Sequence, residues 1–184
     1  ASPTGAVSWI VRWSGRCLLT RNTLKILGSP MRKNFSTQIA GQIGESLVVA
    51  EMGRRGWIAT AFSGNVPDID ILGYRDSRVL HIQVKAWRRG AVSFDAARFL
   101  DIRWEGSHQI VNGFAREVDP RLIYVFVRLG DHAGDDRYFV LNEIQLAKLV
   151  RTGYEAFLAR HGGVRPRNAH TTHNAVSVEQ LGEF

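Results

Sequence analysis

The sequence predicts an α/β domain in which helices flank a mixed central sheet. Three observations predict it. Residues 36–55 carry a helical pattern, residues 68–85 form two alternating strands around a polar turn, and a strongly apolar strand at 121–129 precedes a further strand and a helix. A chain of 184 residues is long enough for one core and short for two. We therefore expect a single domain over residues 31–184, after an extension over 1–30.

The composition is that of a folded globular protein. Hydrophobic residues make up 45% of the chain and charged residues 22%, which argues against disorder. No apolar run approaches the roughly 18 residues that a membrane span requires. The single cysteine, Cys17, excludes an intramolecular disulfide and favours a reducing, cytoplasmic location.

The net charge of +7 is concentrated at the N-terminus. Residues 1–44 contain no acidic residue and six basic ones, which are Arg12, Arg16, Arg21, Lys25, Arg32 and Lys33. Residues 45–184 then hold 18 basic and 17 acidic residues, so the body is nearly neutral. The extension over 1–30 is read in three ways: an upstream addition before Met31, a targeting or membrane-surface segment, or a structured helix.

The first helix is predicted over 36–55 by its apolar spacing and its ends. Apolar residues recur at helical intervals at Ile39, Ile43, Leu47 and Ala50. Ser36 or Thr37 can cap its start, and Gly56 supplies a stop.

Strands follow the helix. We expect one at 57–62, then a hairpin of strands 68–74 and 79–85 joined by the turn "RDSR". Residues 91–118 are mixed, with short strands around 92–94 and 99–104. Further on, the apolar strand at 121–129 is expected to pair with 137–141, Asn142 to cap a second helix, and the tail from Gly162 to be a polar loop.

The hairpin places polar side chains on one face if Tyr74 pairs with Val79. Asp70 then lies opposite Gln83, and Asp68 lies opposite Lys85. Because side chains alternate along a strand, these four share a face with His81. The opposite face is apolar and consists of Ile69, Ile71, Leu80, Ile82 and Val84. An ordinary hairpin with one wet face would show the same alternation, but Asp is disfavoured inside strands.

Glu45 is a second unusual residue, because it falls within an apolar stripe of the first helix. A buried carboxylate is costly unless it is paired, protonated or metal-bound. Gly41 and Gly44 lie just before it. Glycine inside a helix costs about 1 kcal/mol relative to alanine, which indicates that another backbone approaches closely there.

The segments "GQIGESLVVAEMGRRGW" and "VPDIDILGYRDSRVLHIQVKAW" together resemble the PD-(D/E)XK nuclease superfamily. They are most similar to its archaeal Holliday-junction resolvase branch, over roughly residues 38–87. The resemblance implies a restriction-endonuclease-like αβββαβ core. It also implies a metal-dependent endodeoxyribonuclease that hydrolyses DNA phosphodiester bonds, takes branched or structured DNA as a partner, and forms a homodimer.

On this resemblance the site residues are Glu45 on the helix, Asp70 and Gln83 on the hairpin, and the lysine Lys85. These residues would bind Mg²⁺ or Mn²⁺ together with the Val84 carbonyl. Asp68 is kept as an alternate or auxiliary metal ligand. Gln83 departs from the usual Glu or Asp; its carboxamide oxygen can still bind Mg²⁺, but it brings no charge. Lys85 would orient water or stabilise charge on the phosphate.

Basic and aromatic residues directly follow this motif. Trp87, Arg88 and Arg89 are candidate nucleic-acid contacts, followed by Arg98, Arg103 and Trp104, since Arg binds phosphates and Trp stacks on bases. The alternative is a solvated loop with a tryptophan that covers the core. His161, His170 and His173 lack acidic or cysteine partners at metal-site spacing and predict a polar loop.

Three functions therefore remain open at the level of sequence. The first is a Mg²⁺-dependent endonuclease. The second is a catalytically inactive nucleic-acid-binding module on the same fold, which Gln83 and the near-neutral body favour. The third is a scaffold domain without a nucleic-acid role.

Overall fold

The computed structural model describes residues 33–64, 66–115, 119 and 121–182, so the extension over 1–30 lies outside the described residues. The first half of the described chain contains α2 (Lys33–Arg54), β1 (Ile58–Ala61), β2 (Ile71–Arg75), β3 (Arg78–Trp87), β4 (Val92–Asp95), the 3-10 helix η1 (Ala96–Arg98), β5 (Leu100–Glu105) and β6 (His108–Phe114). The second half contains β7 (Leu122–Arg128), β8 (Arg137–Asn142), α3 (Glu143–Arg160), β9 (His173–Val176) and α4 (Val178–Leu181).

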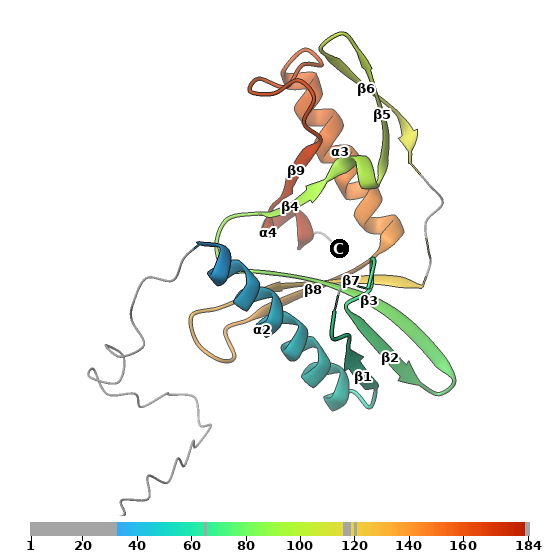
Figure 1. The fold of residues 1–184 in the computed structure, drawn as a ribbon, viewed down its shortest axis with the longest axis vertical. Coiled ribbons are helices and arrows are strands. Elements are labelled where there is room, and N and C mark those ends of the chain that lie inside the picture. Colours follow the sequence, from blue (N-terminus) through green and yellow to red (C-terminus); the bar gives the residue numbers. More distant parts are fainter. Residues whose placement is uncertain (1–32, 65, 116–118, 120, 183–184) are drawn as a thin grey trace, which may run out of the picture.

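Five strands form the central sheet, in the order β1-β2-β3-β7-β8 (Figure 1). The pair β3 and β7 is parallel, whereas the other three neighbouring pairs are antiparallel. The predicted mixed α/β architecture is confirmed.

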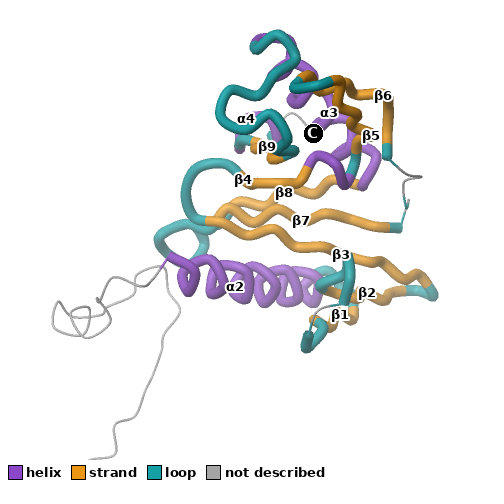
Figure 2. Tube along the Cα trace, turned by 45° about the horizontal axis from the view of Figure 1, so that its top comes forward, coloured by secondary structure: helices purple, strands orange, loops and turns teal. Residues whose placement is uncertain are grey.

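The sheet separates two hydrophobic cores. Helix α2 covers one face, while α3, α4, β4 and β9 lie on the other (Figure 2). The α2 core includes Ala40, Val48, Ile71 and Ile82, and the opposite core includes aromatic residues such as Phe126. In the part of the chain that the structure describes, no helix combines the length and the apolar character that crossing a membrane would require.

One element lies elsewhere than the αβββαβ order predicts. A parallel pair needs a crossover connection, and in the described residues between β3 and β7 this connection contains β4, η1, β5 and β6 but no α-helix. The second long helix, α3, instead follows β8. The crossover contributes its own residues, among them Phe94 and Leu100, to the second core.

Local signals explain where several elements begin and end. Asp76 and Ser77 both have positive φ, so "RDSR" is a tight hairpin turn of the kind whose twist matches its strands. Gly56, with φ of +79°, follows α2 as predicted. Asn142 caps α3 in a capping box with Gln145.

The C-terminal segment is more ordered than the predicted polar loop. Strand β9 pairs with β4, aligning His173 with Asp95, and α4 follows with its own cap at Ser177. Its four-residue strand pairs with a partner about eighty positions earlier, and such long-range pairing leaves little local signal.

Candidate active site at the edge of strand β3

The predicted hairpin register is confirmed. Tyr74 pairs with Val79 and Ile71 with Ile82. Ile82 and Val84 belong to the α2 core, so Gln83 and Lys85 occupy the opposite face because side chains alternate along a strand. Gln83 is aligned with Tyr124 of β7 on that face.

Asp70 stands at the point where the β2–β3 ladder stops. Its backbone N–H donates to the carbonyl of Ile82, and its carboxylate accepts the backbone N–H of Val84 at 2.7 Å. The Asp70 side chain therefore extends the ladder by one bond beyond β2. In a strand the N–H and C=O of one residue point to the same edge, so the Val84 carbonyl faces this edge too.

Helix α2 reaches the same edge because Gly44 allows a close approach. A Cβ built at Gly44 would lie 2.3 Å from the Cβ of Ala86 on β3, whereas one built at Gly41 would meet nothing within 4 Å. The close approach predicted from the two glycines is therefore made at Gly44 alone. The next residue, Glu45, lies close enough to Asp70 for the two charges to interact.

Glu45 and Asp70 interact electrostatically. Glu45 is half-buried, and burial raises the pKa of its carboxyl group, with the negative charge of Asp70 raising it further. Two carboxylates that repel one another at a partly dry edge favour a bound cation, which would relieve both effects.

Gln83 adds an oxygen without a partner. The residue is 8% exposed, and its buried Oε1 accepts no hydrogen bond. An unsatisfied buried oxygen costs free energy that a donor or a cation would recover. Two carboxylates and a carboxamide oxygen are the hard donors that Mg²⁺ or Mn²⁺ takes, so the residues present fit such an ion.

The candidate site holds few negatively charged groups. Within the described ranges, no three His, Cys, Asp or Glu side chains gather closely enough to hold a metal ion. The acidic residues of the candidate site are Glu45 and Asp70, and the third predicted ligand, Gln83, is neutral. The predicted polar C-terminal histidines likewise form no such group in the part of the chain described.

Asp68 lies elsewhere than predicted. Its φ is +67°, which breaks the extended strand two residues before Asp70, so the expected cross-strand position opposite Lys85 is wrong. The Asp68 carboxylate instead forms an ion pair with Arg98, with Oδ1 and Nη2 2.6 Å apart. The structure does not bring Asp68 into a three-carboxylate cluster with Glu45 and Asp70.

The three predicted nucleic-acid contacts separate into two kinds. Trp87 is buried in the second core and its indole N–H donates to the carbonyl of Gly90 at 3.0 Å. The alternative interpretation of Trp87, a tryptophan that covers the core, is therefore the one the structure shows. Arg88 and Arg89 are exposed. They remain candidate phosphate contacts just beyond the end of β3.

Arg98 and Tyr124 lie near the candidate site, although the sequence placed neither of them there. Arg98 lies with its guanidinium carbon 6.0 Å from the centre of the Tyr124 ring, and Tyr124 is the cross-strand neighbour of Gln83. The sequence offered Arg98 only as a further basic residue after the candidate nucleic-acid contacts, and Tyr124 only as part of an apolar strand. Their placement depends on the crossover, which local patterns do not reveal.

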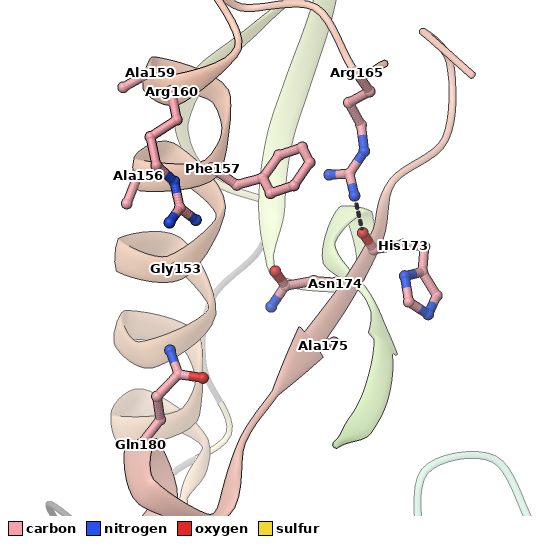
Figure 3. A pocket seen from close by; sticks show the side chains of 10 residues that line it. All are labelled: Gly153, Ala156, Phe157, Ala159, Arg160, Arg165, His173, Asn174, Ala175 and Gln180. Atoms are coloured by element: carbon pink, nitrogen blue, oxygen red, sulfur yellow. Dashed lines mark hydrogen bonds between the residues drawn. The ribbon is translucent and has the colours of Figure 1, made fainter. Parts of the chain in front are cut away.

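A separate pocket of about 660 Å³ lies between α3 and the C-terminal segment (Figure 3). Arg160, Arg165 and His173 line it together with Phe157. The Arg165 guanidinium carbon is 4.5 Å from the centre of the Phe157 ring, and its Nη2 donates to the carbonyl of His173 at 2.6 Å. The pocket contains none of the predicted site residues.

Comparison with known proteins yields one similar structure. A bacterial homing endonuclease, I-Ssp6803I, is similar at 13% sequence identity with a TM-score of 0.41, over 77% of this chain and 78% of the other. No protein-family model and no curated protein matches the sequence. At that level of likeness, residue roles rest on the geometry of the site itself.

Proposed function

We propose that the edge of β3 is the active site of a metal-dependent endonuclease that hydrolyses DNA phosphodiester bonds, as a PD-(D/E)XK-type site in which Gln83 replaces the second acid. The observation that supports it most is that Asp70, whose charge acts on Glu45, is bonded to the backbone of β3 on both sides of Gln83, whose buried side-chain oxygen has no partner. Bound there, Mg²⁺ or Mn²⁺ would polarise the scissile phosphate and offset its charge.

The protein would contribute a rigid arrangement of donors. The Val84 N–H holds one oxygen of Asp70 at 2.7 Å, which leaves the other oxygen of this carboxylate for a ligand. The Val84 carbonyl faces the same edge. Donors fixed on strands hold their geometry better than donors on loops.

Lys85 would supply the positive charge of the reaction. It lies two residues after Gln83 and on the same face of β3. Its ammonium group would stabilise negative charge that develops on the phosphate, or orient the attacking water. Such groups typically contribute 10²–10⁴-fold to a rate.

The test is nicking of plasmid and branched DNA by the full chain in Mg²⁺ or Mn²⁺. Lys85→Ala is expected to lower the rate by at least about 100-fold while the melting temperature stays near that of the wild type. Asp70→Asn is expected to abolish nicking and the rise in melting temperature that Mg²⁺ causes. Equal nicking by the wild type and Lys85→Ala would overturn the mechanism.

A second function is a DNA-binding module without cleavage. The neutral Gln83 favours it, because a site with two carboxylates holds a divalent cation more weakly than one with three. DNA binding by the wild type, without nicking in either metal, would select this function. If the protein neither binds nor nicks DNA, a scaffold domain without a nucleic-acid role is the remaining function.

A further inference from the structure

Arg98 is held beside the candidate site by aromatic rings. It is the last residue of η1, and its guanidinium carbon lies 5.9 Å and 6.0 Å from the ring centres of Phe99 and Tyr124. The side chain is 28% exposed. Because Tyr124 is aligned with Gln83 in the sheet, Arg98 presents its charge on the face that carries Gln83 and Lys85.

The turn that carries Arg98 is fixed at its start. Asp95 caps η1 by accepting the backbone N–H of Ala97, and the Thr172 hydroxyl donates to the same carboxylate oxygen at 2.5 Å. The backbone of the turn that carries Arg98 is thus held by the crossover and the C-terminal segment through bonds that do not involve Asp68.

The contact with Asp68 satisfies the charge of Arg98 but not its hydrogen-bonding capacity. Nη2 is 2.6 Å from the Asp68 carboxylate, yet this buried nitrogen makes no hydrogen bond. Asp68 is half-exposed and sits at a positive φ in the connection between β1 and β2. An ion pair of this kind contributes little to stability and can be exchanged.

A phosphate would serve Arg98 better than Asp68 does. A guanidinium forms paired, charge-assisted hydrogen bonds with phosphate oxygens. A phosphodiester approaching Gln83 and Lys85 would meet Arg98 on the same face of the sheet.

We propose that Arg98 binds a backbone phosphate of the DNA substrate and that Asp68 occupies its guanidinium in the free protein, so that DNA must displace Asp68. This inference rests on the proposed function and adds a phosphate contact and a competing carboxylate to that site.

The test is the salt dependence of duplex binding. Fluorescence anisotropy is measured between 50 and 200 mM salt at constant Mg²⁺, with the full chain carrying Lys85→Ala so that the DNA stays intact. Arg98→Gln is expected to weaken binding and to reduce the slope of log K against log salt by about 0.9, which corresponds to one phosphate contact. Arg54→Gln is the matched control, because Arg54 also pairs with a carboxylate but lies on α2, at the other face of the sheet.

The competing carboxylate is tested separately. Asp68→Asn is expected to tighten DNA binding by about two- to fivefold and to have no effect when Arg98→Gln is already present. Glu51→Gln, which removes the acidic partner of Arg54 and changes the net charge equally, is expected to change binding less. Arg98→Lys keeps the positive charge but lacks the paired N–H donors of the guanidinium. It should restore the slope, with an affinity for DNA between those of the wild-type residue and Arg98→Gln.

The outcomes separate this inference from the proposed function. Two results would overturn this inference. One is that the protein with Arg98 intact binds DNA and Arg98→Gln leaves the slope of log K against log salt unchanged; the other is that Asp68→Asn weakens binding. In either case the ion pair of Arg98 and Asp68 only holds the β1–β2 connection in place. The nuclease proposal then survives. If the chain binds no DNA in any condition, both proposals fail. Should Arg98→Gln unfold, as seen in its circular-dichroism melt, the Asp68→Asn and Arg98→Lys results still decide.

Discussion

The two faces of β3 differ in what their side chains do. Toward α2 the strand presents Ile82 and Val84 to a core so tight that no Cβ fits at Gly44. On the opposite face it presents Gln83, whose buried oxygen has no partner, and Lys85. The face toward α2 therefore stabilises the strand. The opposite face is locally destabilising, because its buried oxygen is unsatisfied, and a bound ligand would recover that free energy. Because both faces share one backbone, the packed face holds the polar face in place.

The largest expected effect comes from disturbing the packed face. Gly44→Ala places a methyl group 2.3 Å from the Cβ of Ala86, so α2 must shift away from β3, at a cost of about 3 kcal/mol. Gly41→Ala is the control. It meets nothing within 4 Å and should stabilise the helix by up to about 1 kcal/mol. Chemical denaturation of both variants measures the difference, and equal stabilities would show that α2 does not press on β3.

A smaller effect is expected from adding charge to the polar face. Gln83→Glu places a further carboxylate at a buried position of the polar face, and without metal it should destabilise the protein by about 1–2 kcal/mol. Mg²⁺ should then raise its melting temperature more than that of the wild type, because a third acid strengthens cation binding. Gln83→Met keeps the volume and should lose the Mg²⁺ response. If Mg²⁺ shifts all three proteins equally, the ion binds elsewhere.

The smallest effect concerns pH. Burial and Asp70 raise the pKa of Glu45 above its ordinary value of 4.5, so the folded state holds this proton more tightly than the unfolded chain. Stability from this group is thus present at low pH and falls as pH rises through the raised pKa. Glu45→Gln should melt about 1–2 °C above the wild type at pH 7.5, with the difference vanishing near pH 4. A constant difference across this range would contradict the role given to Glu45.

Much of the site's framework was predictable because its signals are local. The turn "RDSR" and the alternation of its flanking strands specify the register of β2 and β3, so the positions of Asp70 and Gln83 followed from the sequence. The cap at Asn142 and the stop at Gly56 are also confirmed. Each depends on residues a few positions apart, where geometry is set by the backbone itself.

The errors arise where distant segments meet. Trp87 belongs to one core together with residues of the crossover and of α3, and Asp68 turns away from the strand toward Arg98, thirty residues later. No periodic pattern distinguishes a buried tryptophan after a strand from an exposed one. The pairing of β9 with β4 was missed for the same reason.

By itself, the sequence determined the α/β class, the first helix, the hairpin and its register, and the sharing of one face by Gln83 and Lys85, because alternation and turn chemistry act over a few residues. Tertiary structure alone decided that Gly44 is the glycine that contacts β3, that Glu45 and Asp70 lie close enough for their charges to interact, and that Arg98 stands over Tyr124. These facts depend on how α2 and the crossover pack against the two faces of the sheet, and packing between distant segments is a property of the folded chain.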